Sequence, residues 1–278
     1  MAENPIRLCT VSLLSRQPLT FDPFALHDEL QKRCGQVKFL DQDKDTPPYG
    51  YVYLDVFTEY EGQAIPVGTF IHPAEMPALN ETHTRAMQQS WDWEQARTIV
   101  PQCRYRLSII DFMASNLSPQ ARATLMHRVV LSVLELVSCD AIYWENSEHF
   151  TDPAVYQDPA QSATLDLVYG MVNFRLFKIS SGGPGEMVMD SLGLHLLGLP
   201  DVQCHFVGLN PDTVASFLFN IASYLFEKGD IIHDGETVPG FDPESRWPCR
   251  HEIALVGPER MVLDIEPGEP YRAGESRQ

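Results

Sequence analysis

The sequence predicts an α+β fold of two similar halves, each a mostly antiparallel sheet with helices packed on one face. Three observations lead to this prediction. A polar residue followed by proline opens three segments with helical periodicity, several other segments alternate apolar and polar residues, and these segments recur in one order along the chain. A chain of 278 residues has room for one large domain or two smaller ones.

The three predicted helices share one start signal. The pairs Asp22-Pro23, Ser118-Pro119 and Asn210-Pro211 each precede an apolar stripe of helical spacing. A short polar side chain accepts a free backbone N–H at the helix start, and proline after it loses no hydrogen bond. Gly35 and Gly229 are expected to end the first and third helices. Shorter helices are predicted over residues 81–93 and 189–199.

Strands are predicted where the residues alternate or form short apolar runs. Residues 51–60 and 63–71 form a hairpin about Glu61-Gly62, and residues 171–179 form a second hairpin with 187–189. The remaining predicted strands are residues 104–112, 140–144, 202–209 and 230–238, followed by two strands within 251–267 around the Gly257-Pro258 turn.

The order of these elements repeats. Residues 51–145 and 166–238 both run hairpin, helix, strand, proline-started helix, strand. An internal duplication explains this order, and so does the chance recurrence of a common rhythm. We therefore expect a first half over residues 1–150, a connector over 151–165, a second half over 166–266 and a flexible acidic tail over 267–278.

The charge balance limits the classes of partner. The chain has 38 acidic and 20 basic residues, a formal net charge of -18. Nucleic acids and anionic membranes need a positive footprint, so both are disfavoured. The charge suits a basic protein partner, or only a well-solvated surface.

The cysteines and the start of the chain predict a location. The six cysteines occur singly, without a Cys-x-x-Cys pair, which is typical of reduced thiols. Residues 1–15 lack the basic start and long apolar run of a secretory leader, and no stretch is long enough to span a bilayer. We therefore expect a cytoplasmic protein that does not enter the membrane.

Residues 189–214 concentrate side chains that could form a metal site. Asp190 is expected to start a short helix that contains His195, whereas Cys204 and His205 are consecutive on a strand and face opposite ways. Cys249 and His251 share a strand face but lack a second pair of ligands. We therefore predict no metal, and the absence of nucleotide-binding glycine motifs predicts no cofactor.

Catalytic residues are only weakly indicated. Ser191, His205 and Asp234 have the residue types of a triad, but no nucleophile elbow is present. Glu145 follows a predicted strand beside Trp144, where partial desolvation would suit an acid or base. An enzyme of the hydrolase or transferase class, using Glu145, His205 or His251, stays open as an alternative.

Four side chains are candidates for partner contact. Trp144 lies at a predicted strand end, and Trp247 lies in a polar loop with Arg246 and Arg250. Tryptophan and arginine often anchor protein interfaces. The alternatives are that Trp144 lies in the core and that the loop only closes a sheet edge.

Four stretches together resemble a bacterial family, the domain of unknown function numbered 4261. They are residues 141–150, 189–206, 224–240 and 254–265, which include Leu-Gly-Leu-Pro-Asp-Val-Gln and Gly-Pro-Glu-Arg. We expect the similarity to extend over most of the chain, from its first strand to its last. The resemblance implies a cytoplasmic bacterial protein and supplies no reaction or catalytic residue. It also suggests a link to toxin or secretion systems, which agrees with an acidic interaction protein.

These observations favour a non-enzymatic acidic interaction protein with a basic partner, such as an immunity or accessory protein of a toxin or secretion system. Residues 189–206 are then a structural segment in which Gly193, Gly198 and Pro200 shape a turn before a central strand.

Overall fold

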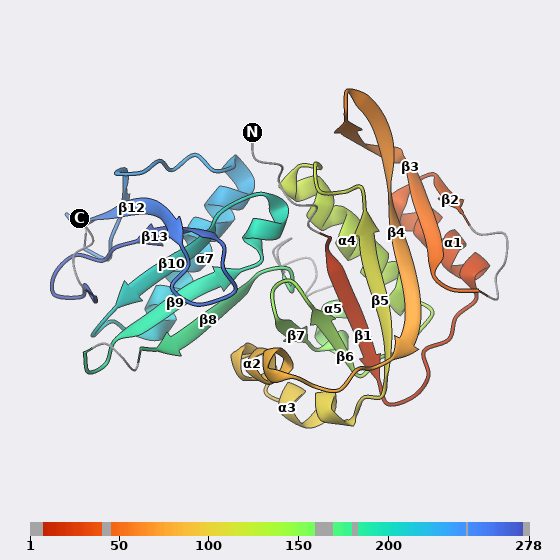
Figure 1. Cartoon of the computed structure of the whole chain (residues 1–278), viewed down its shortest axis with the longest axis horizontal. Coiled ribbons are helices and arrows are strands. Elements are labelled where there is room, and N and C mark those ends of the chain that lie inside the picture. The colour runs from red at the N-terminus through yellow and green to blue at the C-terminus, as the bar shows by residue number, and fades with distance from the viewer. Residues whose placement is uncertain (1–7, 41–45, 159–168, 180–182, 243, 275–278) are drawn as a thin grey trace. The chain divides into compact units, whose positions relative to one another are not determined.

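The computed structural model describes residues 8–40, 46–158, 169–179, 183–242 and 244–274. The chain divides into two compact units, which are residues 1–171 (unit 1) and 172–278 (unit 2). Each unit contains one sheet and its own helices, so the fold is of the α+β class (Figure 1).

Unit 1 is built on a seven-stranded sheet with the order β2-β3-β4-β5-β1-β6-β7. Each neighbouring pair is antiparallel. The strands are β1 (Thr10–Ser15), β2 (Val37–Phe39), β3 (Tyr49–Tyr60), β4 (Gln63–Glu75), β5 (Tyr105–Phe112), β6 (Ala141–Trp144) and β7 (His149–Thr151). The helices are α1 (Pro23–Cys34), α2 (Glu81–Gln89), α3 (Ala96–Ile99), α4 (Pro119–Leu134) and α5 (Pro153–Gln157).

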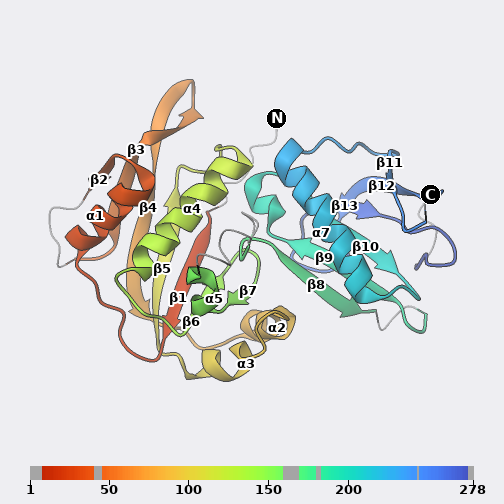
Figure 2. The same ribbon diagram turned by 180° about the vertical axis from the view of Figure 1, so that it is seen from behind.

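Helices cover both faces of this sheet. Helices α1 and α4 lie across one face (Figure 2), where Tyr51 donates to the carbonyl of Pro23 and Arg122 pairs with Asp111. Helices α2 and α3 cover one end of the opposite face through a buried apolar cluster that includes Leu14, Tyr143, Phe150, Ala86 and Trp93. Unit 1 therefore differs from the expected arrangement with helices on a single face.

Unit 2 contains a six-stranded sheet with the order β11-β12-β13-β10-β9-β8. Its strands are β8 (Asn173–Lys178), β9 (Met187–Leu192), β10 (Asp201–Phe206), β11 (Thr237–Pro239), β12 (Arg246–Ile253) and β13 (Met261–Ile265). Only β10 and β13 run parallel; the other neighbours are antiparallel. Helix α7 (Pro211–Lys228) packs across one face, as Figure 2 shows.

The proline-started helices are confirmed. Asp22, Ser118 and Asn210 each cap a helix whose first residue is the following proline, and each side chain accepts a backbone N–H. The hairpin turn Glu61-Gly62 is also confirmed, with both residues at positive φ. Local hydrogen bonds fix these features, which is why the sequence predicts them well.

Two segments differ from the prediction. Residues 189–192 belong to β9 rather than a helix; the chain leaves the strand at Gly193, whose φ is 137°, and a 3-10 turn follows (Leu194–Leu197). Residues 230–236 form a loop, and only Thr237–Pro239 pairs as a strand. The carboxylates of Asp230 and Asp234 bond to His251 there, which holds the loop away from strand pairing.

The unit boundary also differs from the expected connector. Of residues 151–165, the described part completes β7 and forms α5 within unit 1, and residues 159–165 lie outside the described residues. Within the predicted tail, Tyr271 accepts a hydrogen bond from Val207 and Arg272 bridges to Phe206. Residues 267–274 thus pack on the sheet of unit 2 rather than forming a flexible tail.

A duplication is not shown. Both units place a hairpin beside a third antiparallel strand, β3-β4-β5 in one and β8-β9-β10 in the other. The strand after the long helix then differs in position. β6 is separated from β5 by β1 alone, whereas β11 is separated from β10 by both β13 and β12.

Candidate functional site

A row of polar residues crosses the sheet of unit 2. The strand registers align Arg175, Asp190, Gln203, Asp264 and Arg250 on β8, β9, β10, β13 and β12. Aligned residues share a face, and Phe174, the neighbour of Arg175, packs against Phe219 of α7. The polar row therefore lies on the face opposite α7.

One part of this face is a buried ionic network. Arg175 binds Asp190 through Nε and Nη2 at 3.0 and 2.7 Å, and all of these side-chain atoms belong to fully buried residues. Arg260 joins Asp190 at 2.7 Å to Asp201 at 2.9 Å. Buried charges persist only when they are paired and hydrogen-bonded, as these are.

Asp201 is the centre of the network. It accepts hydrogen bonds from the Ser191 hydroxyl and the Leu194 backbone N–H, and it contacts Nδ1 of His195 at 2.7 Å. Burial raises the pKa of Asp201, but the hydrogen bond and charge of His195, with the charge of Arg260, lower it more, so the net pKa lies below its usual range. Ser191, Leu194 and His195 thus converge on one buried carboxylate, which fixes the turn that follows β9.

The connection between β12 and β13 covers this network. The backbone N–H of Leu255 donates to Oε1 of Gln203, and Nε2 of Gln203 donates to Asp264. Arg260, at the end of the same connection, reaches the carbonyls of Val256 and Pro258. The half of the face that holds the ionic network is thereby closed to solvent.

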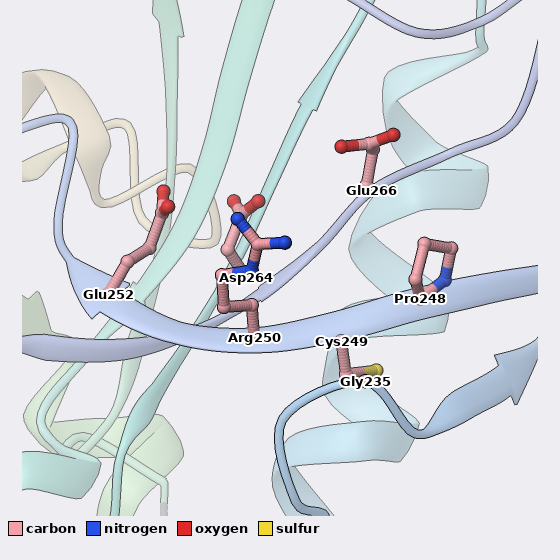
Figure 3. Close-up of a pocket in the computed structure, with 7 residues that line it drawn as sticks. All are labelled: Gly235, Pro248, Cys249, Arg250, Glu252, Asp264 and Glu266. Atoms are coloured by element: carbon pink, nitrogen blue, oxygen red, sulfur yellow. The ribbon is translucent and has the colours of Figure 1, made fainter. Parts of the chain in front are cut away.

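The other half of the face holds a cavity of about 330 Å³. Its lining residues are His205, Glu252, Leu255, Asp264, Glu266, Ala273 and Gly274. A smaller cavity of about 80 Å³ shares Glu252, Asp264 and Glu266 and is also lined by Arg250. In Figure 3 these four charged side chains project to the same side of β12 and β13. We call the two together the acidic cavity.

Ala273 and Gly274 form one wall of the acidic cavity. Arg272 pairs with Glu266 at 3.1 Å, and Gly274 lies so close to His205 that a Cβ would be 3.0 Å from the ring. His205 also contacts Glu186 at 3.2 Å. The three carboxylates of Glu252, Asp264 and Glu266 outnumber the guanidinium groups of Arg250 and Arg272 beside them. The remaining acidic excess attracts a positively charged group, such as an ammonium or guanidinium.

The predicted catalytic residues do not form one site. Glu145 lies in unit 1, where it accepts a hydrogen bond from Ser12 at 2.7 Å. His205 faces the acidic cavity, whereas His251 alternates with Arg250 on β12 and so lies on the α7 side of the sheet. Both ring nitrogens of His251 contact carboxylates, Asp234 at 2.8 Å and Asp230 at 3.1 Å.

The predicted binding residues divide into buried and exposed pairs. Trp144 is 2 % exposed and Trp247 is 3 % exposed, so both are core side chains rather than surface anchors. Trp144 packs among His127 and Tyr156, and Trp247 packs against Phe217 of α7. Arg246 and Arg250 are exposed, and Arg250 lines the acidic cavity.

Among the described residues, no three His, Cys, Asp or Glu side chains are grouped to hold a metal ion. Cys249 and His251 do share a strand face, but burial raises the pKa of Cys249 to about 11, which keeps the thiol protonated near neutral pH. Nothing in the sequence singles out Glu252, Asp264 and Glu266, because the two strands predicted about Gly257-Pro258 do not reveal which other side chains face the same cavity.

The comparison with protein families concerns unit 2. Residues 190–266 match the family described as a domain of unknown function, DUF4261. The DUF4261 segment confirms the resemblance seen in the sequence, but it is shorter than expected and excludes residues 141–150. It includes Asp201 and Arg260 of the ionic network and Glu252, Asp264 and Glu266 of the acidic cavity. No curated protein and no solved structure matches the chain.

In the described ranges, no helix is both long enough and apolar enough to cross a membrane.

Proposed function

We propose that this is a non-enzymatic interaction protein that receives a positively charged side chain of a basic partner in its acidic cavity. The observation that carries the proposal is the convergence of Glu252, Asp264 and Glu266 on one cavity of about 330 Å³. A carboxylate cluster stabilises a bound cation by charge-assisted hydrogen bonds.

The charge of the whole chain supports the same kind of partner. A net charge of -18 attracts a positive protein and repels nucleic acid and anionic membrane. We propose a bacterial, cytoplasmic setting, with a role as an immunity or accessory protein of a toxin or secretion system. A small basic toxin domain would supply both the overall charge and the arginine or lysine that the cavity fits.

A photo-crosslinking experiment tests this proposal. A benzoylphenylalanine at Leu255, which lines the cavity and is 37 % exposed, should capture a basic protein on irradiation in the native host. The same group at Tyr224, which is 45 % exposed on α7, is the matched control on the other side of the sheet.

We expect the Leu255 adduct to disappear when Glu252 and Glu266 are changed to Gln, and the Tyr224 position to give no such adduct. Capture of an acidic protein, or capture that survives both substitutions, would contradict the proposal.

A further inference from the structure

The hairpin of β3 and β4 extends beyond its neighbours in the sheet of unit 1. β2 pairs only with Tyr51–Tyr53, and β5 pairs with β4 only from Gly68 onwards. In the described part of the chain, residues 57–66 therefore form strand pairs only with each other, and the side chain of Asn116 donates to the carbonyl of Glu59 at 3.1 Å. We call residues 54–66 the arm; it projects past the rest of the sheet in Figure 1.

The arm carries large apolar side chains that are open to solvent. Leu54, Phe57 and Tyr60 are 39, 52 and 48 % exposed. A two-stranded ribbon buries little of its own surface, so exposed aromatic residues on it give no benefit to folding. They do provide contact area for a partner.

The apolar surface continues from the arm onto the sheet. Phe57 pairs with Pro66, and Gly68 pairs with Phe112, so Phe57 and Phe112 lie on one face. Phe70 shares that face and contacts Phe112 with ring centroids 5.5 Å apart. This face is opposite the one covered by α1 and α4, and Phe112 is 43 % exposed.

The charges on the arm have one sign. No Lys or Arg occurs between Lys44 and Arg85, a stretch that contains all of β3 and β4. The arm itself carries Asp55, Glu59 and Glu61. Lys38 of β2 lies on the same face of the sheet, in register with Val52, but the arm itself carries only carboxylates. An apolar surface that carboxylates border on the arm is complementary to a segment that alternates basic and apolar residues.

We propose that the arm is a docking surface for an extended, basic segment of a partner protein. The segment adds beside residues 57–66, whose strand edges are not used by β2 or β5, and places apolar side chains against Phe57 and Phe112. Its Lys or Arg side chains pair with Glu59 and Glu61. This surface is separate from the acidic cavity, and the proposal does not depend on the function proposed for that cavity.

Binding of a synthetic peptide to the full chain tests the proposal. The probe is a labelled peptide of about ten residues that alternates lysine and valine, a length typical of a long strand. Fluorescence anisotropy gives its affinity, and hydrogen exchange gives its location. We expect slower exchange of amides 57–65 when the peptide is added.

Two arm variants separate the apolar and charged contributions. Phe57→Ser, and Asp55→Asn with Glu59→Gln and Glu61→Gln, should each weaken binding at least about tenfold. These residues are exposed or lie on the arm, so circular dichroism should show an unchanged fold. Phe219→Ser with Tyr224→Ser, at 41 and 45 % exposure on α7, is the matched control and should bind like the wild type.

Equal affinity of the arm variants and the wild type would overturn the proposal, as would protection confined to unit 2. Sedimentation velocity tests whether a second copy of this chain occupies the arm instead. A dimer that the arm substitutions abolish and that excludes the peptide would replace the proposed partner with a second copy.

Discussion

At the scale of single residues, Arg260 links segments of unit 2 that lie far apart in the sequence. Its guanidinium binds Asp201, Asp190 and the Ser191 carbonyl, which are 59, 70 and 69 residues away in the sequence. The sequence predicts Asp190 to start a helix because its local neighbours resemble one. Its ionic partners are remote, and no pattern within a few residues reveals them.

Substitution of Arg260 should therefore be costly. Arg260→Met leaves two buried carboxylates short of a partner, which should lower the free energy of unfolding by about 3–5 kcal/mol. Urea denaturation measures the change. Arg272→Met is the comparison, because its ion pair with Glu266 is 27 and 39 % exposed and should contribute below about 1 kcal/mol. Equal losses in the two variants would show that the network does not stabilise unit 2.

His251 should make the loop of residues 230–236 sensitive to pH. Burial lowers the pKa of His251, but the hydrogen bonds and charges of Asp234 and Asp230 raise it more, so the net shift is upward from 6.5. A folded pKa above the unfolded one stabilises the protein below about pH 6.5. That contribution is lost as the pH rises through the folded pKa.

Hydrogen exchange of amides 230–236, corrected for intrinsic rates, measures this effect. We expect the loop to open more readily as the pH rises from 6 to 8. His251→Gln should remove the pH dependence, whereas His72→Gln on the exposed part of β4 should leave it unchanged. A wild-type loop with no pH dependence would contradict the assignment.

At the scale of elements, the sequence predicts best what neighbouring residues determine. Asp22, Ser118 and Asn210 cap their helices through backbone groups only two or three residues away. The loop at 230–236 was predicted as a strand because its apolar residues suit one. His251, 17 residues from Asp234 and 21 from Asp230, holds it as a loop instead.

Gly170 shows how closely the chain before β8 packs on β6. Its φ is +80°, and an added Cβ would lie 2.1 Å from Nε1 of Trp144. Gly170→Ala should therefore cost about 1–2 kcal/mol for the left-handed backbone and about 1–3 kcal/mol more for the overlap. Thermal or urea unfolding measures the total.

Gly62→Ala is the matched control for the backbone contribution. Gly62 has a φ of +75°, and no atom lies within 4 Å of its added Cβ. Gly62→Ala should therefore lower the free energy of unfolding only by the cost of the left-handed backbone, about 1–2 kcal/mol. If Gly170→Ala and Gly62→Ala lower the free energy of unfolding equally, the side chain of Trp144 moves aside at no cost and the close packing is not rigid.

At the scale of the whole molecule, composition predicts the sign of the net charge but not where the acidic side chains gather on the surface. The total of -18 is evident from the sequence, and so is the stretch of β3 and β4 without basic residues. The acidic cavity could not be predicted, because the strands about Gly257-Pro258 give no sign that His205 of β10 and Gly274 complete its lining. Trp144 and Trp247, which the sequence favours as anchors, lie in the two cores instead.

The measurement that tests the central proposal most directly is the association rate of the crosslinked partner as a function of ionic strength. Steering by the acidic cavity predicts a rate that falls steeply as salt is added, since charges are screened beyond about 8–10 Å near physiological ionic strength. Glu252→Gln with Glu266→Gln should lower the rate at low salt and flatten its dependence. A rate that does not change with salt, or the same slope in the wild type and the variant, would contradict the role of the acidic cavity in recognition.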